Sequence, residues 1–90
     1  MTGQFAISGA GHDKGVLYVV MAEKGDFVYL SDGRLKNPDR PKKKRRKHIQ
    51  PIKAEVDEGL MAKFLTGEVV RPEEIRYAIR QFESRKQQIK

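Results

Sequence analysis

The chain of 90 residues has no cysteine, and none of its apolar stretches is long. Without cysteine it can form neither a disulfide framework nor a thiolate zinc site, so we expect a reducing, cytoplasmic setting. Its longest apolar run, 16–22, is far below the roughly 20 residues that a membrane span needs, and its first residues lack the pattern of a signal peptide. These absences predict one small domain without a membrane partner, monomeric when free.

Groups suited to catalysis are also scarce. His12 and His48 are the two histidines and lie far apart in sequence, while the acidic pairs 57–58 and 73–74 stand where helix N-termini favour carboxylates. No combination supplies a nucleophile, a base and an orienting group. A metal site from His12, Asp13 and His48 is an alternative that we do not favour. We expect a non-enzymatic protein that needs no cofactor.

Positive charge is what the chain has in excess, with a net charge of +7 and a pI of about 9.9. The excess is concentrated in one segment, because 34–53 carries +9 while 1–33 carries −2 and 54–90 is neutral. A surface that serves only solubility interleaves its charges. This segregation indicates a polyanionic partner, such as nucleic acid.

Six consecutive cations, Lys42 to Lys47, dominate the basic segment, and His48 follows them. A run of this kind can be a mobile solvated loop or a nuclear localisation signal. Three features favour a binding surface: the run lies between strand-like segments, prolines restrict it to extended forms, and it holds most of the net charge. Its cations are expected to bind phosphates without reading sequence well.

The N-terminal third has the pattern of short strands joined by tight turns. Alternating residues at 4–8 predict one strand, and β-branched and aromatic residues at 16–22 predict a second. A third is expected at 27–31, across a hairpin loop at 23–26. The glycine-rich stretch 9–15 must reverse the chain, and its exposed backbone N–H groups are candidates for phosphate contact.

The middle of the chain continues this pattern less clearly. A tight turn is expected at 32–33, after which 34–36 can begin another short strand. After a basic loop at 36–48, the closing strand is expected at 48–52, where Pro51 confines it to a sheet edge or a bulge. Strands this short and this closely spaced predict a barrel or a sandwich.

From residue 57 onward the apolar period becomes that of helices. A first short helix is expected to end at Gly67, with an apolar stripe of Leu60, Met61, Phe64 and Leu65. A second is expected to begin at Pro72, with a stripe of Ile75, Ala78, Ile79 and Phe82. We expect the helical pair either to pack against the strands or to be only partly ordered.

The aromatic side chains divide into packing and stacking candidates. Phe27 and Tyr29 share one face of the third strand, and we expect them in the core. Tyr18 is then the better candidate for stacking on an unpaired base. Phe64 and Phe82 belong to the helical stripes, so they are expected to serve packing.

Two stretches together carry a resemblance to a known family. "AISGAGHDKGVLYVVMAEKGDFVYLSDG" resembles the KOW motif of ribosomal proteins and transcription elongation factors. "DGRLKNPDRPKKKRRKHIQPI" is similar to the small bacterial KOW-domain RNA-binding proteins, which are related to the fourteen-e type large-subunit ribosomal proteins of archaea and eukaryotes. "LTGEVVRPEEIRYAIRQF" looks like the helical tail of the bacterial group.

The resemblance implies a mainly β fold, an SH3-like (KOW-type) β-barrel of about five strands in 1–56, with two short helices as an appendage in 57–90. It also implies binding of RNA, with ribosomal RNA and the ribosome as partners. The implied RNA-binding residues are those of the KOW loop, the turn that follows the third strand and the cationic run: Gly11, His12, Asp13, Lys14, Gly15, Arg34, Lys36, Lys42, Lys43, Lys44, Arg45, Arg46, Lys47 and His48.

Two other functions stay open. An SH3-like barrel can be a protein-interaction module that docks peptides, and the KOW resemblance also permits a DNA-binding factor of a transcription complex. Peptide docking has no need of a segment that carries +9. A nuclear localisation signal is set aside because the resemblance is to bacterial proteins, which have no nucleus.

Overall fold

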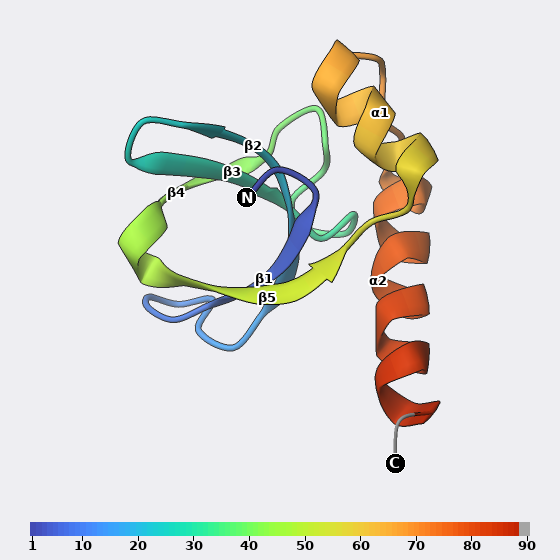
Figure 1. Cartoon of the computed structure of the whole chain (residues 1–90). Helices are drawn as coiled ribbons and strands as arrows, with labels where there is room; N and C mark the ends of the chain where they lie inside the picture. The colour runs from blue at the N-terminus through green and yellow to red at the C-terminus, as the bar shows by residue number, and fades with distance from the viewer. Residues whose placement is uncertain (89–90) are drawn as a thin grey trace.

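Five antiparallel strands form one open sheet in the order β4-β3-β2-β1-β5, followed by two helices (Figure 1). The structure is a computed structural model that describes residues 1–88, and side chains as far as Arg85. The elements are β1 (Gln4–Ser8), β2 (Leu17–Lys24), β3 (Phe27–Ser31), β4 (Lys42–Arg45), η1 (Arg46–His48), β5 (Ile49–Glu55), α1 (Glu58–Thr66) and α2 (Pro72–Gln88). The predicted mainly β chain with two C-terminal helices is confirmed, although 89–90 of the predicted appendage lie outside the described residues.

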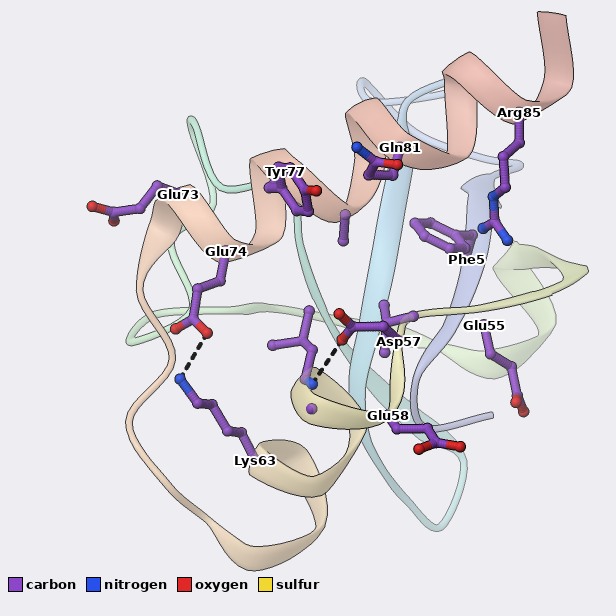
Figure 2. A pocket seen from close by; sticks show the side chains of 14 residues that line it. Phe5, Glu55, Asp57, Glu58, Lys63, Glu73, Glu74, Tyr77, Gln81 and Arg85 are labelled. Atoms are coloured by element: carbon purple, nitrogen blue, oxygen red, sulfur yellow. Dashed lines mark hydrogen bonds and ion pairs between the residues drawn. The ribbon is translucent and has the colours of Figure 1, made fainter. Parts of the chain in front are cut away.

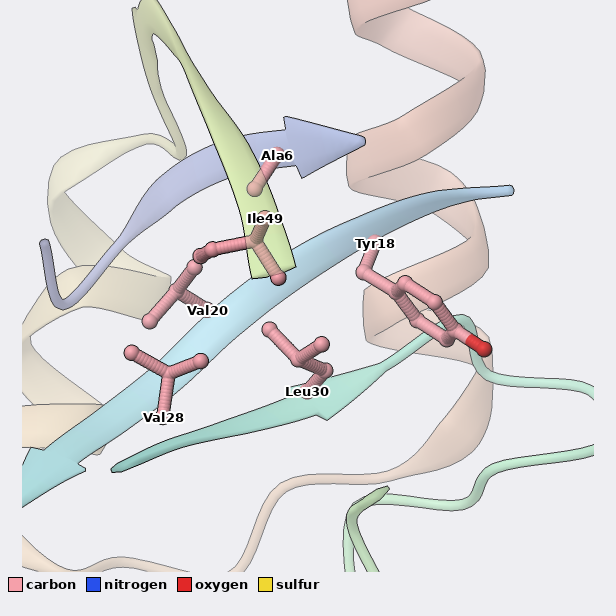
Figure 3. Close-up of a cluster of buried hydrophobic side chains, with 6 residues drawn as sticks. All are labelled: Ala6, Tyr18, Val20, Val28, Leu30 and Ile49. Carbon is pink, nitrogen blue, oxygen red and sulfur yellow. The ribbon is translucent and has the colours of Figure 1, made fainter. Parts of the chain in front are cut away.

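The sheet curls around a first core of small and aliphatic side chains. Ile49 of β5 belongs to the same buried cluster as Val28 and Leu30 of β3, although β2 and β1 separate these strands in the sheet. The cluster consists of Ala6, Tyr18, Val20, Val28, Leu30 and Ile49 (Figure 3). Strands β4 and β5 stand at the two edges without pairing to one another, and the single turn of η1 joins them along the chain.

A second core lies on the outer side of β1 and β2, where the helices cover the sheet. Successive strand residues point to opposite faces, so Phe5 and Val19 contact the helices while Ala6 faces the first core. Phe5 stacks on Phe82 of α2 with ring centroids 4.6 Å apart. The buried members are Phe5, Val19, Val56, Leu60 and Ile75. The strands and the helices therefore share a core, as expected from their adjoining apolar faces.

The helices begin and end where their sequence signals predict. The Asp57 carboxylate accepts a hydrogen bond from the Leu60 N–H at 2.9 Å, which caps α1, and Gly67 ends that helix in the left-handed conformation at φ 76°. Pro72 is the first residue of α2. One member of the predicted stripe is wrongly placed, since Leu65 is 70% exposed and contacts neither core.

Two predicted connections differ from the structure. The hairpin loop predicted at 23–26 is shorter, because β2 extends to Lys24 and only Gly25 and Asp26 separate it from β3. The strand predicted at 34–36 does not form. The Asp32 carboxylate accepts hydrogen bonds from the N–H groups of Arg34 and Lys36, each at 2.9 Å, which commits this backbone to a turn.

The predicted basic loop at 36–48 is also wrong over much of its length. Residues 42–45 form β4, which pairs with β3 from Leu30↔Lys42 to Phe27↔Arg45. Strand β4 is an edge strand, where lysines are favoured because they discourage pairing with another chain. The closing strand β5 begins one residue later than predicted and ends three later, and its edge position suits Pro51.

Within residues 1–88, the helices are too short or too polar to cross a membrane.

Gly33 sets the distance between the sheet and α2. Its φ is 72°, and a Cβ there would lie 2.5 Å from the Pro72 carbonyl oxygen and 3.0 Å from the Arg76 nitrogen. The Arg76 guanidinium also donates to the Gly33 carbonyl at 2.6 Å. No side chain fits here without moving the first turn of α2.

The variant G33A should lower the free energy of unfolding by about 2–4 kcal/mol, because it combines left-handed strain of roughly 1–2 kcal/mol with a backbone clash. The matched control is G25A, which has a similar φ of 59° but open space around the added methyl group. Urea denaturation measures both variants. Equal losses of stability would show that the packing against α2 is not tight.

Candidate nucleic-acid interface

The alternation of β4 divides the cationic run into two sets with different surroundings. Lys42 and Lys44 pair with Leu30 and Val28, so they lie on the inner face of the sheet. The other two residues of β4, Lys43 and Arg45, project from the outer face. The predicted site is therefore not one surface of six equivalent cations.

The inner lysines bind a carboxylate from the glycine loop, which we define as residues 9–16. Lys44 donates to Asp13 Oδ1 at 2.8 Å and to the Ala10 carbonyl at 2.7 Å, and Lys42 Nζ lies 3.6 Å from Asp13 Oδ2. The Lys44 side chain is only 10% exposed. These contacts bring the two predicted binding segments together, and they also remove Lys44 from phosphate binding.

Asp13 receives two further hydrogen bonds from the strands on either side of its loop. Ser8 of β1 donates to Oδ1 at 2.8 Å, and Tyr18 of β2 donates to Oδ2 at 2.9 Å. The carboxylate is 12% exposed and faces inward. Asp13 is among the predicted RNA-binding residues, and the structure places its carboxylate among donors from β1, β2 and β4.

This network perturbs two ionisable groups in opposite directions. Burial disfavours the Asp13 anion, but hydrogen bonds from Lys44, Ser8 and Tyr18 outweigh burial and hold the pKa of Asp13 well below its usual value. Burial and the neighbouring Asp13 carboxylate raise the pKa of Tyr18 above its usual value. Asp13 therefore stays ionised and Tyr18 stays a hydrogen-bond donor across the physiological pH range.

The outward side chains of two neighbouring strands make a mixed aromatic and cationic surface. We call it the β3–β4 outer face, and it consists of Phe27, Tyr29, Lys43 and Arg45. The Lys43 ammonium lies 4.3 Å from the Phe27 ring centroid, and the Arg45 guanidinium lies 5.2 Å from it. Within residues 1–85, no carboxylate pairs with either cation.

The predicted burial of the aromatic residues is reversed. Phe27 and Tyr29 are half-buried on the outer face, while Val28 and Leu30 occupy the core instead. Tyr18, the predicted stacking residue, is 2% exposed and bonds to Asp13, so it cannot reach a base. Strand β3 is apolar on both faces, and its sequence alone does not say which face is covered. Phe64 and Phe82 do pack in the second core, as predicted.

The 3-10 turn η1 carries the rest of the cationic run. Arg46 donates to Glu23 at 3.1 Å and to the Gly25 carbonyl at 2.8 Å, which ties it to the β2–β3 hairpin. Lys47 and His48 are exposed. The His48 carbonyl accepts from the Gly9 N–H at 2.8 Å, so η1 ends beside the glycine loop.

The glycine loop offers less free backbone than predicted. The N–H of Lys14 donates to the Gly11 carbonyl at 3.2 Å, and the N–H of Gly15 donates to the Ser8 carbonyl at 2.8 Å. The N–H groups of Gly11 and His12 have no partner among the described residues. Gly15 has a φ of 90° and nothing near its Cβ position, so its role is conformational. The exposed groups of the loop are Gly11, His12, Lys14 and Gly15.

Arg34 and Lys36 lie in the turn that follows β3. Their turn packs against α2 through Gly33. Arg34 is exposed and lines a recess of about 330 Å³ with Arg76 and Arg80 of α2, next to Val16 at the end of the glycine loop. Among the described residues, no group of three His, Cys, Asp or Glu side chains could hold a metal ion.

No family model matches this chain, and no curated protein matches it in sequence.

The variant D13N should lower the free energy of unfolding by about 2–4 kcal/mol at pH 7, because it leaves Lys44 buried without its counter-charge. The pKa of Asp13 is lower in the folded than in the unfolded chain, so its contribution is complete above the unfolded value near 3.8 and is lost as the pH falls below it. Urea denaturation at pH 7, 5 and 3 should show the difference from wild type shrinking only at pH 3.

The matched control is D26N, which removes an exposed carboxylate that has no partner among the described side chains. It should change stability by less than about 0.5 kcal/mol. A D13N deficit that stays constant from pH 7 to pH 3 would mean that the loss is steric rather than electrostatic.

Proposed function

We propose that this chain is a non-enzymatic RNA-binding protein of the KOW kind that binds ribosomal RNA and associates with the ribosome. The observation that carries the proposal is the β3–β4 outer face, where Lys43 and Arg45 stand beside Phe27 and Tyr29 without a carboxylate partner among the described residues. Cations that no carboxylate neutralises attract phosphates, and aromatic rings stack on unpaired bases.

Further exposed cations lie on η1, which follows β4, and on the glycine loop. Lys47 and His48 on η1 are exposed, and the hydrogen bond from Gly9 to the His48 carbonyl sets them beside the glycine loop with its exposed Lys14. Phosphates bound by these cations would position the RNA, and the rings would hold bases that are splayed out of a helix. Recognition is then led by RNA shape and by single-stranded loops rather than by a sequence code.

We also propose that the curled sheet is an SH3-like barrel of the KOW type. Support comes from the strand order β4-β3-β2-β1-β5, from the single turn of η1 between the edge strands, and from the one buried cluster that Ile49 of β5 shares with Val28 and Leu30 of β3. In this proposal, side chains rather than backbone pairing complete the closure, with Asp13 and Lys44 at one end of the first core.

The first experiment separates RNA binding from its rivals. A structured ribosomal RNA fragment and duplex DNA of equal length compete for the labelled protein, and the RNA should bind more tightly. Preference for duplex DNA would favour a transcription factor, and binding of neither would favour a protein-interaction module.

Sedimentation of cell lysate through gradients then tests association with the ribosome. The protein should sediment with ribosomes at low salt and dissociate from them at high salt.

Removing the outward cations should weaken RNA binding and its salt dependence without unfolding the protein. The variant K43A/R45A/K47A should flatten the log–log dependence of affinity on salt by about 2, since each phosphate that a cation neutralises adds ~0.7–0.9 to the slope. Lys44 is left in place because it supports the fold. Fluorescence anisotropy with the ribosomal RNA fragment, from low to high salt, measures the slope.

The matched control is K53A/R71A/R85A, which removes the same number of exposed cations from β5 and from the helical part of the chain. Its slope should stay close to that of wild type. Equal slopes for the two triple variants would mean that total charge, and not the β3–β4 outer face, determines binding.

The aromatic part of the surface has its own test. The variant F27L/Y29L keeps apolar volume but removes both rings, so affinity for a single-stranded RNA should fall about tenfold, since stacking contributes roughly 1–3 kcal/mol per base. The salt slope should not change, because no charge is removed. A fully paired RNA of the same length should lose much less affinity, and a loss of the same size for both RNAs would argue against stacking.

A further inference from the structure

A groove of about 950 Å³ lies between α1 and α2, away from the cationic run in sequence and in structure. Its surface is mainly apolar, and its lining residues include Val56, Leu60 and Ala78. Figure 2 shows two aromatic members of the lining, Phe5 on β1 and Tyr77 on α2. Tyr77 is 56% exposed, and large exposed apolar side chains at an apolar groove mark interaction sites. We propose that this groove binds a basic amphipathic helix from a partner protein.

The rim of the groove has a charge opposite to that of the chain. Five carboxylates and two cations line it, so it carries −3 in a protein of net charge +7: Glu55, Asp57, Glu58, Glu73 and Glu74 against Lys63 and Arg85. Glu73 and Glu74 lie at one end of the groove and Glu55 and Glu58 at the other (Figure 2). A ligand with cations on both sides of an apolar centre would match this arrangement.

Two of the five carboxylates already serve the fold. Asp57 caps α1, and Glu74 accepts from Lys63 at 2.7 Å and from the Arg71 N–H at 2.9 Å. Glu55, Glu58 and Glu73 have no cationic partner among the described side chains. These three remain available to lysines or arginines of a partner, and their positions at both ends give the groove charge complementarity along its length.

The shape and charge of the groove select the occupant. Residues of both helices line the groove, and an amphipathic helix binds in such an apolar groove through anchors at i, i+3, i+4 and i+7. RNA is disfavoured because the rim carboxylates repel phosphates. The inference does not depend on RNA binding, since the groove shares no residue with the β3–β4 outer face.

The probe is a fluorescein-labelled 14-residue peptide with leucines at i, i+3, i+4 and i+7 and lysine or arginine elsewhere. The control peptide keeps the leucines but has glutamate and glutamine in place of the cations. Anisotropy should show micromolar binding of the basic peptide only. Amide shifts of the ¹⁵N-labelled full chain should change around Leu60, Tyr77 and Ala78. Shifts confined to β3, β4 or η1 would overturn the proposal.

Two variants separate the apolar and the charged contributions. Y77A should weaken binding about tenfold, as expected for an aromatic anchor. E58Q/E73Q should weaken it about fivefold at low salt and less at high salt, because the rim charges are screened. The matched control D26N/D39N changes the net charge equally at exposed sites outside the groove and should leave binding unchanged.

Three other results would also overturn the proposal. Equal binding of both peptides would mean that the groove does not select cations. Equal losses of affinity in E58Q/E73Q and D26N/D39N would mean that attraction is to the whole protein. Concentration-dependent self-association that Y77A abolishes, measured by analytical ultracentrifugation, would assign the groove to a second copy of the chain.

Discussion

The inward carboxylate of Asp13 is the constraint on which the arrangement of charges depends. A strand of four consecutive cations would repel itself if all of its side chains faced solvent together. Here the alternation of β4 sends Lys42 and Lys44 inward, where Asp13 neutralises them and Ser8 and Tyr18 complete the hydrogen bonding of its carboxylate. The ion pair of Asp13 with Lys44 also connects the edge strand β4 to the loop between β1 and β2. The same interaction thus stabilises the curl of the sheet and leaves the remaining cations facing outward.

The two faces of the sheet are used unequally along the strand order. On the inner face, side chains from β1, β2, β3 and β5 make one core. On the outer face, the helices cover β1 and β2 but leave the β3–β4 outer face exposed. A chain of this size gains stability from each of these covered surfaces, because a single small core is marginal. The outer side of β3 and β4 is the part of the sheet that remains open for a ligand.

The surface is electrically divided, and the division gives the molecule an orientation. Among the described side chains, Lys43, Arg45 and Lys47 on β4 and η1 have no carboxylate partner, whereas Glu55, Glu58 and Glu73 at the groove between α1 and α2 have no cationic partner. A polyanion approaching the protein is attracted to one region and repelled by the other, which favours a single binding orientation. A partner with a basic helix would be attracted to the groove and repelled by the cations on β4 and η1. The two proposed ligands therefore need not compete, and a complex that contains both could be assembled on one small domain.

Local patterns in the sequence determined most elements, and only the tertiary structure decided which side chains face a ligand. The strands at 4–8 and 27–31, the caps Asp57 and Gly67 and the helix start at Pro72 follow from short-range steric and hydrogen-bonding rules, which the sequence carries at each position. The basic strand was mistaken for a loop because its stability comes from pairing with β3 and from an ion pair across 31 residues. The face of β3 that carries Phe27 and Tyr29 was misassigned for a related reason. Both faces of that strand are apolar, and its exposure depends on where the helices pack, which is a long-range outcome that no local pattern encodes.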